Sequence, residues 1–157
     1  MILMPHMLVG ATIGARIKNF GVIFVISILL HFLFDRLPHW EYIKKIDIKK
    51  GISRRKLSSI FCRAVIDLSL GAGIIWLFWK DSPHLFFIVF GAFISILPDG
   101  LVFLHLLIRA MGKREIPLLR NFYNFHEKIH ISEHGNFPIW GLATESLIVV
   151  LAFYLIS

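Results

Sequence analysis

Four ionisable residues interrupt otherwise apolar runs of this 157-residue chain, and they constrain its fold more than any other feature. His31 and Asp35 lie in GVIFVISILLHFLFD, and Asp67 lies in IFCRAVIDLSLGAGIIWLFW. Asp99 lies in PHLFFIVFGAFISILPDGLVFLHLL. An ionisable side chain within hydrocarbon is costly, so it usually faces the interior of a helix bundle and has a function there. The pattern therefore predicts hydrophobic helices around a polar site.

The composition favours a membrane protein with one domain over residues 1–157. Hydrophobic residues make up 57% of the chain and the mean hydropathy is +0.73, whereas soluble domains are about 45–50% apolar. The single Cys62 excludes an internal disulfide. We expect an all-α bundle of about five hydrophobic helices, the first short and the fourth broken near Pro98. Their expected ranges are 5–16, 20–37, 57–79, 83–111 and 138–156.

Basic residues predict the orientation of the bundle. Eight Lys and Arg lie in residues 44–63 and five in residues 109–128, against three in the turns on the other side. Because cytoplasmic loops carry the excess of Lys and Arg, we expect segments 38–56 and 112–137 to be cytoplasmic loops. Their expected partners are membrane lipids, with anionic headgroups at the basic loops. No nucleic acid is expected, because the apolar runs leave no soluble binding module.

This orientation places the ionisable residues at a common depth. At about 1.5 Å per helical residue, His31 and Asp35 lie roughly 18–24 Å below the outer end of their helix. Asp99 lies roughly 22 Å below His84 on the same scale. Both estimates fall in the cytoplasmic third of a hydrocarbon core that is about 30 Å thick. We therefore expect these side chains to meet.

A metal site is the interpretation that we favour for this convergence. In His31-Phe-Leu-Phe-Asp35 the two ligand types share one helix face, because positions i and i+4 are neighbours. Zinc accepts both imidazole and carboxylate, and manganese is the alternative. A hydrogen-bonded His–Asp pair that only joins helices also fits, and Asp99 also fits the role of a helix N-cap. The predicted ligands are His6, His31, Asp35, Asp99, His126 and His130.

The segment HEKIHISEH supplies further candidates. His126, His130 and His134 follow an i, i+4, i+8 spacing that forms one face of a helix. Glu127 and Glu133 lie beside the predicted ligands and are the candidate catalytic bases. Asp67 follows Arg63 by four residues, which favours an ion pair between them. Four residues remain undecided as ligands, and they are His39, His105, His134 and Glu145.

Several short motifs together resemble a known family. They are Pro5-His6-x-x-x-Gly10, His31-x-x-x-Asp35 followed by Pro38-His39, Leu97-Pro98-Asp99, and the region from His126 to His130. Their order is similar to that in a family of bacterial inner-membrane metal-dependent hydrolases, one branch of which is LexA-regulated. The resemblance implies a multi-pass protein of the inner membrane with a metal site. A fainter likeness, in ligand types only, is to zinc-dependent phospholipase C.

Three functions are consistent with these sequence features. The first is a membrane-bound metal-dependent hydrolase that acts at the cytoplasmic face on a phosphoester or a lipid-linked phosphate. The second is a transporter of a metal ion or of protons, which needs polar groups that continue to the far side. The third is a non-catalytic membrane protein whose His/Asp network only packs helices. The absence of ionisable residues from the outer half favours the first.

Overall fold

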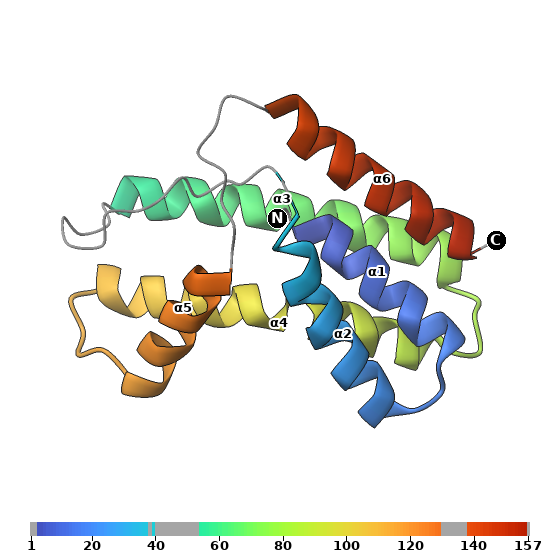
Figure 1. Ribbon diagram of the computed structural model, residues 1–157, viewed down its shortest axis with the longest axis horizontal. Coiled ribbons are helices and arrows are strands. Elements are labelled where there is room, and N and C mark those ends of the chain that lie inside the picture. Colours follow the sequence, from blue (N-terminus) through green and yellow to red (C-terminus); the bar gives the residue numbers. More distant parts are fainter. Residues whose placement is uncertain (1–2, 38, 40–53, 130–137, 157) are drawn as a thin grey trace.

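The computed structural model describes residues 3–37, 39, 54–129 and 138–156 (Figure 1). The described residues form helices and no strands, so the predicted all-α class is confirmed. All five predicted hydrophobic segments are helical. A further helix, α5, lies within the segment 112–137 that we expected to be a loop. The helices are α1 (Leu3–Arg16), α2 (Phe20–Phe34), α3 (Arg54–Trp79), α4 (Leu85–Ala110), α5 (Pro117–Ile129) and α6 (Pro138–Ile156).

Two helices begin where a side chain accepts one of their unpaired main-chain N–H groups. Asn19 is the N-cap of α2, and its side chain accepts the N–H of Val22 at 3.1 Å. Near the start of α1, Oδ2 of Asp67 accepts the N–H of Met4 at 2.9 Å. Asp67 thus caps a neighbouring helix, and the predicted pair with Arg63 is wrong. The capping is favoured because the first N–H groups of a helix lack partners within it.

The helix α4 is continuous through Pro98, so the predicted break there is wrong. Proline removes its own N–H and crowds the carbonyl four residues earlier, but the hydrogen bonds on either side can continue the helix. Hydrophobic helices tolerate such a proline where neighbouring elements satisfy the main chain that it frees. As a result, α4 is a single helix of 26 residues, about 39 Å along its axis.

Glycines let α1 lie directly against α4. A Cβ atom on Gly10 would overlap the carbonyl of Gly91, and one on Gly14 would overlap the carbonyl of Phe87. Small residues at such spacing allow close contact between hydrophobic helices. Leu8 and Ile88 are fully buried beside this contact. The contact holds the start of α1, which carries His6, at a constant position relative to α4.

Figure 1 shows α3 and α4 as the two long helices of the fold. The helices α1, α2 and α6 gather around the half of this pair that is near the turn joining them, whereas α5 packs on the other half of α4. Within the described residues, two helices are long and apolar enough to cross a membrane, at Arg55–Trp79 and Leu85–Ala110. Many large apolar side chains on these helices face outward, among them Leu77 and Phe86.

Candidate metal centre

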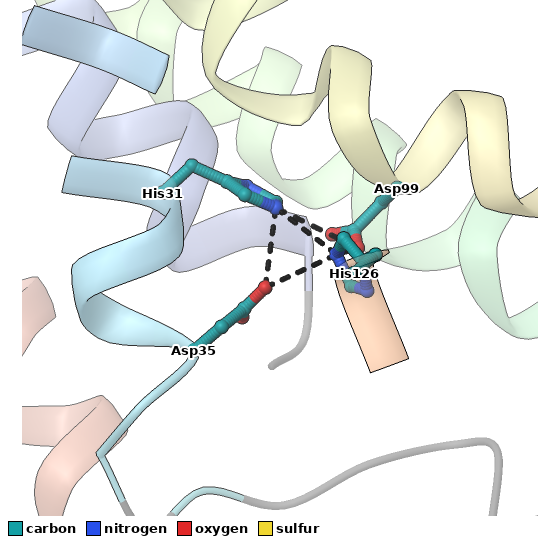
Figure 2. Close-up of side chains that lie close together, drawn as sticks. All are labelled: His31, Asp35, Asp99 and His126. Atoms are coloured by element: carbon teal, nitrogen blue, oxygen red, sulfur yellow. Dashed lines mark hydrogen bonds and ion pairs between the residues drawn. The ribbon is translucent and has the colours of Figure 1, made fainter. Parts of the chain in front are cut away.

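Four side chains from three helices converge in the interior (Figure 2). His31 lies in the last turn of α2 and Asp35 is the C-cap of that helix. Asp99 lies on α4, and His126 lies on α5. The side chains of His31 and Asp35 are fully buried, and that of His126 is nearly so. The Asp99 side chain keeps 20% of its surface exposed, so it is the most accessible of the four.

Each helix brings its donor to the site for a local reason. His31 and Asp35 are one helical turn apart, so they lie on the same face of α2. His126 is buried because it shares with Leu119 and Tyr123 the face of α5 that packs on α4. There Tyr123 packs with Val102 and Leu106 in a small core that excludes water. This core fixes α5 on α4, and it thereby places His126 within reach of Asp99.

The four donor atoms lie close enough together to hold one metal ion. The Nε2 atom of His31 lies 3.1 Å from Asp35 Oδ2, 3.4 Å from His126 Nε2 and 3.9 Å from Asp99 Oδ1. His126 Nε2 lies 3.3 Å from Asp35 Oδ2 and 3.5 Å from Asp99 Oδ1. All four atoms lie within 4.8 Å of one another. Zinc bonds of 2.0–2.2 Å in a tetrahedron separate the ligand atoms by about 3.3–3.6 Å.

The hydrogen bond from Nδ1 of His31 leaves Nε2 as the ring nitrogen that can bind a metal. Its Nδ1 lies 2.8 Å from the carbonyl oxygen of Ser95. A carbonyl only accepts, so Nδ1 carries the proton, and in the neutral ring Nε2 holds a lone pair. In that form the lone pair faces the carboxylates of Asp35 and Asp99, an arrangement that a bound cation would make favourable. A main-chain carbonyl bound to the far nitrogen is also the usual support of a metal-ligating histidine.

The charges around His126 raise the pKa of its imidazole to about 9. Burial by itself lowers this pKa, because the charged ring loses hydration. The hydrogen-bonded carboxylates of Asp35 and Asp99 outweigh that effect and stabilise the imidazolium. Without a metal, His126 therefore carries a proton at neutral pH.

The second oxygen of Asp99, Oδ2, is buried without a hydrogen-bond partner among the described residues. The donor set is thus rich in negative charge and fits a divalent cation, which makes these four residues a group that can hold a metal ion.

His6 lies beside this group but contacts a different atom. Its Nε2 lies 3.2 Å from Asp35 Oδ1, whereas the other oxygen of Asp35 faces His31 and His126. The ring of His6 also lies against the ring of His31, with centroids 4.3 Å apart. His6 is fully buried, as expected of a residue that serves the site. The structure therefore places His6 where it can hold Asp35 in position.

The remaining candidates lie apart from the four donors or outside the described residues. Glu127 is exposed on α5, next to His126. His105 is buried and stacks on Tyr123, with ring centroids 5.1 Å apart. Glu145 is buried on α6, and Nδ1 of His39 lies against the carbonyl of Leu37. Three candidates fall outside the described residues, and they are His130, Glu133 and His134.

Two supports of the site were not predicted from the sequence. One is the Ser95 carbonyl that orients His31, and a main-chain acceptor has no signature in sequence. The other is the face of α5 that docks on α4 through Leu119 and Tyr123. The i, i+4, i+7 spacing of Leu119, Tyr123 and His126 is the signal that could have revealed this face.

Comparison with known proteins identifies no relative. No protein-family model matches the chain, and neither a curated protein nor a solved structure matches it.

Proposed function

We propose that this protein is a membrane-embedded, metal-dependent hydrolase that acts at the cytoplasmic face on a phosphoester or a lipid-linked phosphate. The observation that carries the proposal is the group of two imidazoles and two carboxylates whose donor atoms lie within 4.8 Å of one another. We propose zinc as the ion, because zinc accepts this mixed donor set. Manganese is the alternative, since carboxylates also suit it.

The membrane part of the proposal is supported by length, composition and charge. Two described helices are long and apolar enough to span a bilayer. Large apolar side chains cover their outer faces, where they would contact lipid rather than water. The Lys and Arg residues concentrate at the ends of α3 and α4 that are away from the turn joining them. We infer that these ends face the cytoplasm of a bacterial inner membrane.

The chemical part follows from the donors and their exposure. A bound divalent cation supplies Lewis-acid chemistry, because it activates water near neutral pH and stabilises charge on a phosphoryl oxygen. Asp35 and the two histidines would hold the ion from the buried side, and Asp99 would hold it from the accessible side. In the hydrolysis, water adds to phosphorus, the bond from phosphorus to the alcohol oxygen breaks, and the proton lost by water goes to that oxygen. Glu127, next to His126, stays our predicted base for that proton, and Glu133 is the alternative.

The positions of buried charge favour hydrolysis over transport. In the described parts of α1 to α4, the buried ionisable side chains lie about ten or more residues along their helices from the turns at Arg16 and Lys80. Toward these turns, the buried polar side chains that the structure describes are Thr12, Ser27 and Ser95. An ion that crossed the bilayer would need ligands along the whole path. A hydrolase site that the substrate enters from one face of the membrane needs no ligands between the site and the other face.

Metal analysis and phosphate release test the proposal together. The protein, purified in detergent, is expected to hold about one equivalent of metal per chain and to release phosphate from anionic phospholipids when zinc or manganese is added. Asp35→Asn should lose both metal and turnover. Glu127→Gln should keep the metal and lose turnover by about 10²–10⁴-fold. Protein that holds metal, hydrolyses no phosphoester and carries ions into liposomes would contradict the hydrolase and favour a transporter.

A further inference from the structure

The helix α5 has three distinct faces, and the candidate metal site uses only one of them. Leu119, Tyr123 and His126 form the buried face, which packs on α4 and reaches the site. Polar side chains form an exposed face on the opposite side. A third face lies between these two and is both apolar and exposed. This third face has no role in the proposed chemistry, and its composition indicates what covers it.

The exposed apolar face is a stripe along the whole helix. Leu118, Phe122, Phe125 and Ile129 follow one another at i, i+4, i+7 and i+11, which places them in one line on a helix. The Leu118 side chain is 77% exposed and the Phe125 side chain 51%. Phe122 and Ile129 are half-buried. We call this line of four residues the α5 stripe.

The α5 stripe continues an apolar surface on α2. The ring of Phe125 meets the ring of Phe32 edge to face, with centroids 5.6 Å apart. Beside Phe32, the side chains of Leu29 and Leu33 are 64% and 53% exposed. These leucines lie on a helix that is apolar over nearly its whole length. The two helices therefore present one joined apolar surface, and whatever covers α2 also reaches the α5 stripe.

The opposite face of α5 carries positive charge. Arg120 and Lys128 are exposed there together with one acid, Glu127, and with Asn121 and Asn124, so this face carries a net charge of +1. Lys113 and Arg114, in the segment that precedes the helix, are exposed as well. An amphipathic helix with an apolar stripe and a cationic polar face is typical of helices that lie in the plane of a membrane surface. In Figure 1, α5 runs across α4 rather than along it, as such a placement requires if α4 spans the bilayer.

We propose that α5 is an interfacial helix, with the α5 stripe among the acyl chains of the cytoplasmic leaflet and its cationic face toward the anionic headgroups. His126 is adjacent to Phe125 in the chain, so a ligand of the candidate metal site would lie near the boundary between the acyl chains and those headgroups. The substrate is then a phospholipid that reaches the site from the leaflet, not a water-soluble phosphoester. This assignment of substrate rests on the proposed hydrolase function, whereas the placement of α5 does not.

Quenching of single labels tests the placement without any assay of activity. In a Cys62→Ser background, the chain carries one fluorescent label at Leu118→Cys or Phe125→Cys on the stripe. The matched positions on the polar face are Asn121→Cys and Asn124→Cys. In vesicles of phosphatidylcholine and phosphatidylglycerol, nitroxide-labelled lipid should quench the two stripe positions, and aqueous iodide should quench the two polar positions. Equal iodide quenching at all four positions overturns the placement, and so does protection of the stripe from both quenchers, which would assign it to a protein contact.

A pair of charge substitutions tests the substrate. Leu118→Asp and Asn121→Asp add the same charge on opposite faces of α5, and both side chains are exposed. Leu118→Asp should lower turnover of vesicle phospholipid by about tenfold, because its charge disfavours the acyl region. It should leave the metal content and the turnover of a soluble glycerophosphodiester unchanged, and Asn121→Asp should change neither. An equal loss on both substrates, or no loss on lipid, overturns the substrate assignment. Absence of turnover on every substrate would instead contradict the proposed function, and the quenching pattern would still decide where α5 lies.

Discussion

The imidazole of His31 donates its Nδ1–H to the main-chain carbonyl of Ser95 across 2.8 Å, and this bond orients the whole candidate site. It joins the end of α2 to the middle of α4 and directs Nε2 of His31 into the space between Asp35 and Asp99. The acceptor is main chain, so it cannot be lost by a side-chain substitution at Ser95. The His31 ring therefore has this orientation in the structure.

Removal of the His31 ring should abolish tight metal binding. His31→Ala deletes one of four donors and also leaves the buried carboxylates with less compensation. We expect metal affinity to fall by at least about 100-fold, since even outer supports of such sites are worth about 10–100-fold. Competition with a chromogenic chelator measures the change. His84→Ala, in the turn before α4, is the matched control and should bind metal as the wild type does.

His6 should behave as a support of Asp35 and not as a ligand of the same ion. It contacts Oδ1 of Asp35, while the opposite oxygen faces the other donors. His6→Ala should therefore lower metal affinity by about 10–100-fold, which is less than the loss for Asp35→Asn. Equal losses in the two variants, measured with the same chelator, would make His6 a ligand as the sequence predicted.

The affinity for metal should rise with pH up to about 9. The pKa of His126 is raised to about 9 in the metal-free site, because its two carboxylate partners outweigh burial. A metal needs the neutral ring, so at pH 7 its binding displaces one proton. Affinity should then increase about tenfold per pH unit between about pH 7 and pH 9 and level off above that. Titration calorimetry in buffers of different ionisation enthalpy counts the released proton, and release of none would contradict the assignment.

The contact between α1 and α4 should not accept a methyl group. In Gly10→Ala the new Cβ meets the carbonyl of Gly91, which is main chain and cannot move aside cheaply. We expect a loss of about 1–3 kcal/mol in the free energy of unfolding. Gly73→Ala, on α3, meets nothing within 4 Å and should be neutral or stabilising by up to about 1 kcal/mol. Thermal melts in detergent compare the two, and equal shifts would mean that the contact is loose.

The hydrophobic helices could be predicted because periodicity, prolines and glycines are local features of the sequence. The convergence of His31, Asp35 and Asp99 could be predicted as well, since the rise per residue places them at similar heights along neighbouring helices. These three residues do meet, and His126 joins them from a segment that we expected to be a loop. The sequence could not reveal how α5 docks, because that depends on the shape of the surface formed by Val102 and Leu106. The break predicted at Pro98 is wrong, because the residues on both sides of the proline keep the helical conformation.

The orientation of the bundle can be tested at two exposed positions. Lys113 follows the end of α4, and Asp81 lies in the turn between α3 and α4. If the basic segments are cytoplasmic, a membrane-impermeant maleimide should label Asp81→Cys in intact cells and should label Lys113→Cys only after the membrane is opened. Both variants need the Cys62→Ser background, because Cys62 is exposed. Labelling of Lys113→Cys in intact cells would reverse the orientation and place the candidate metal site at the outer face. The site would then not face the cytoplasm, where we propose that its substrates are bound.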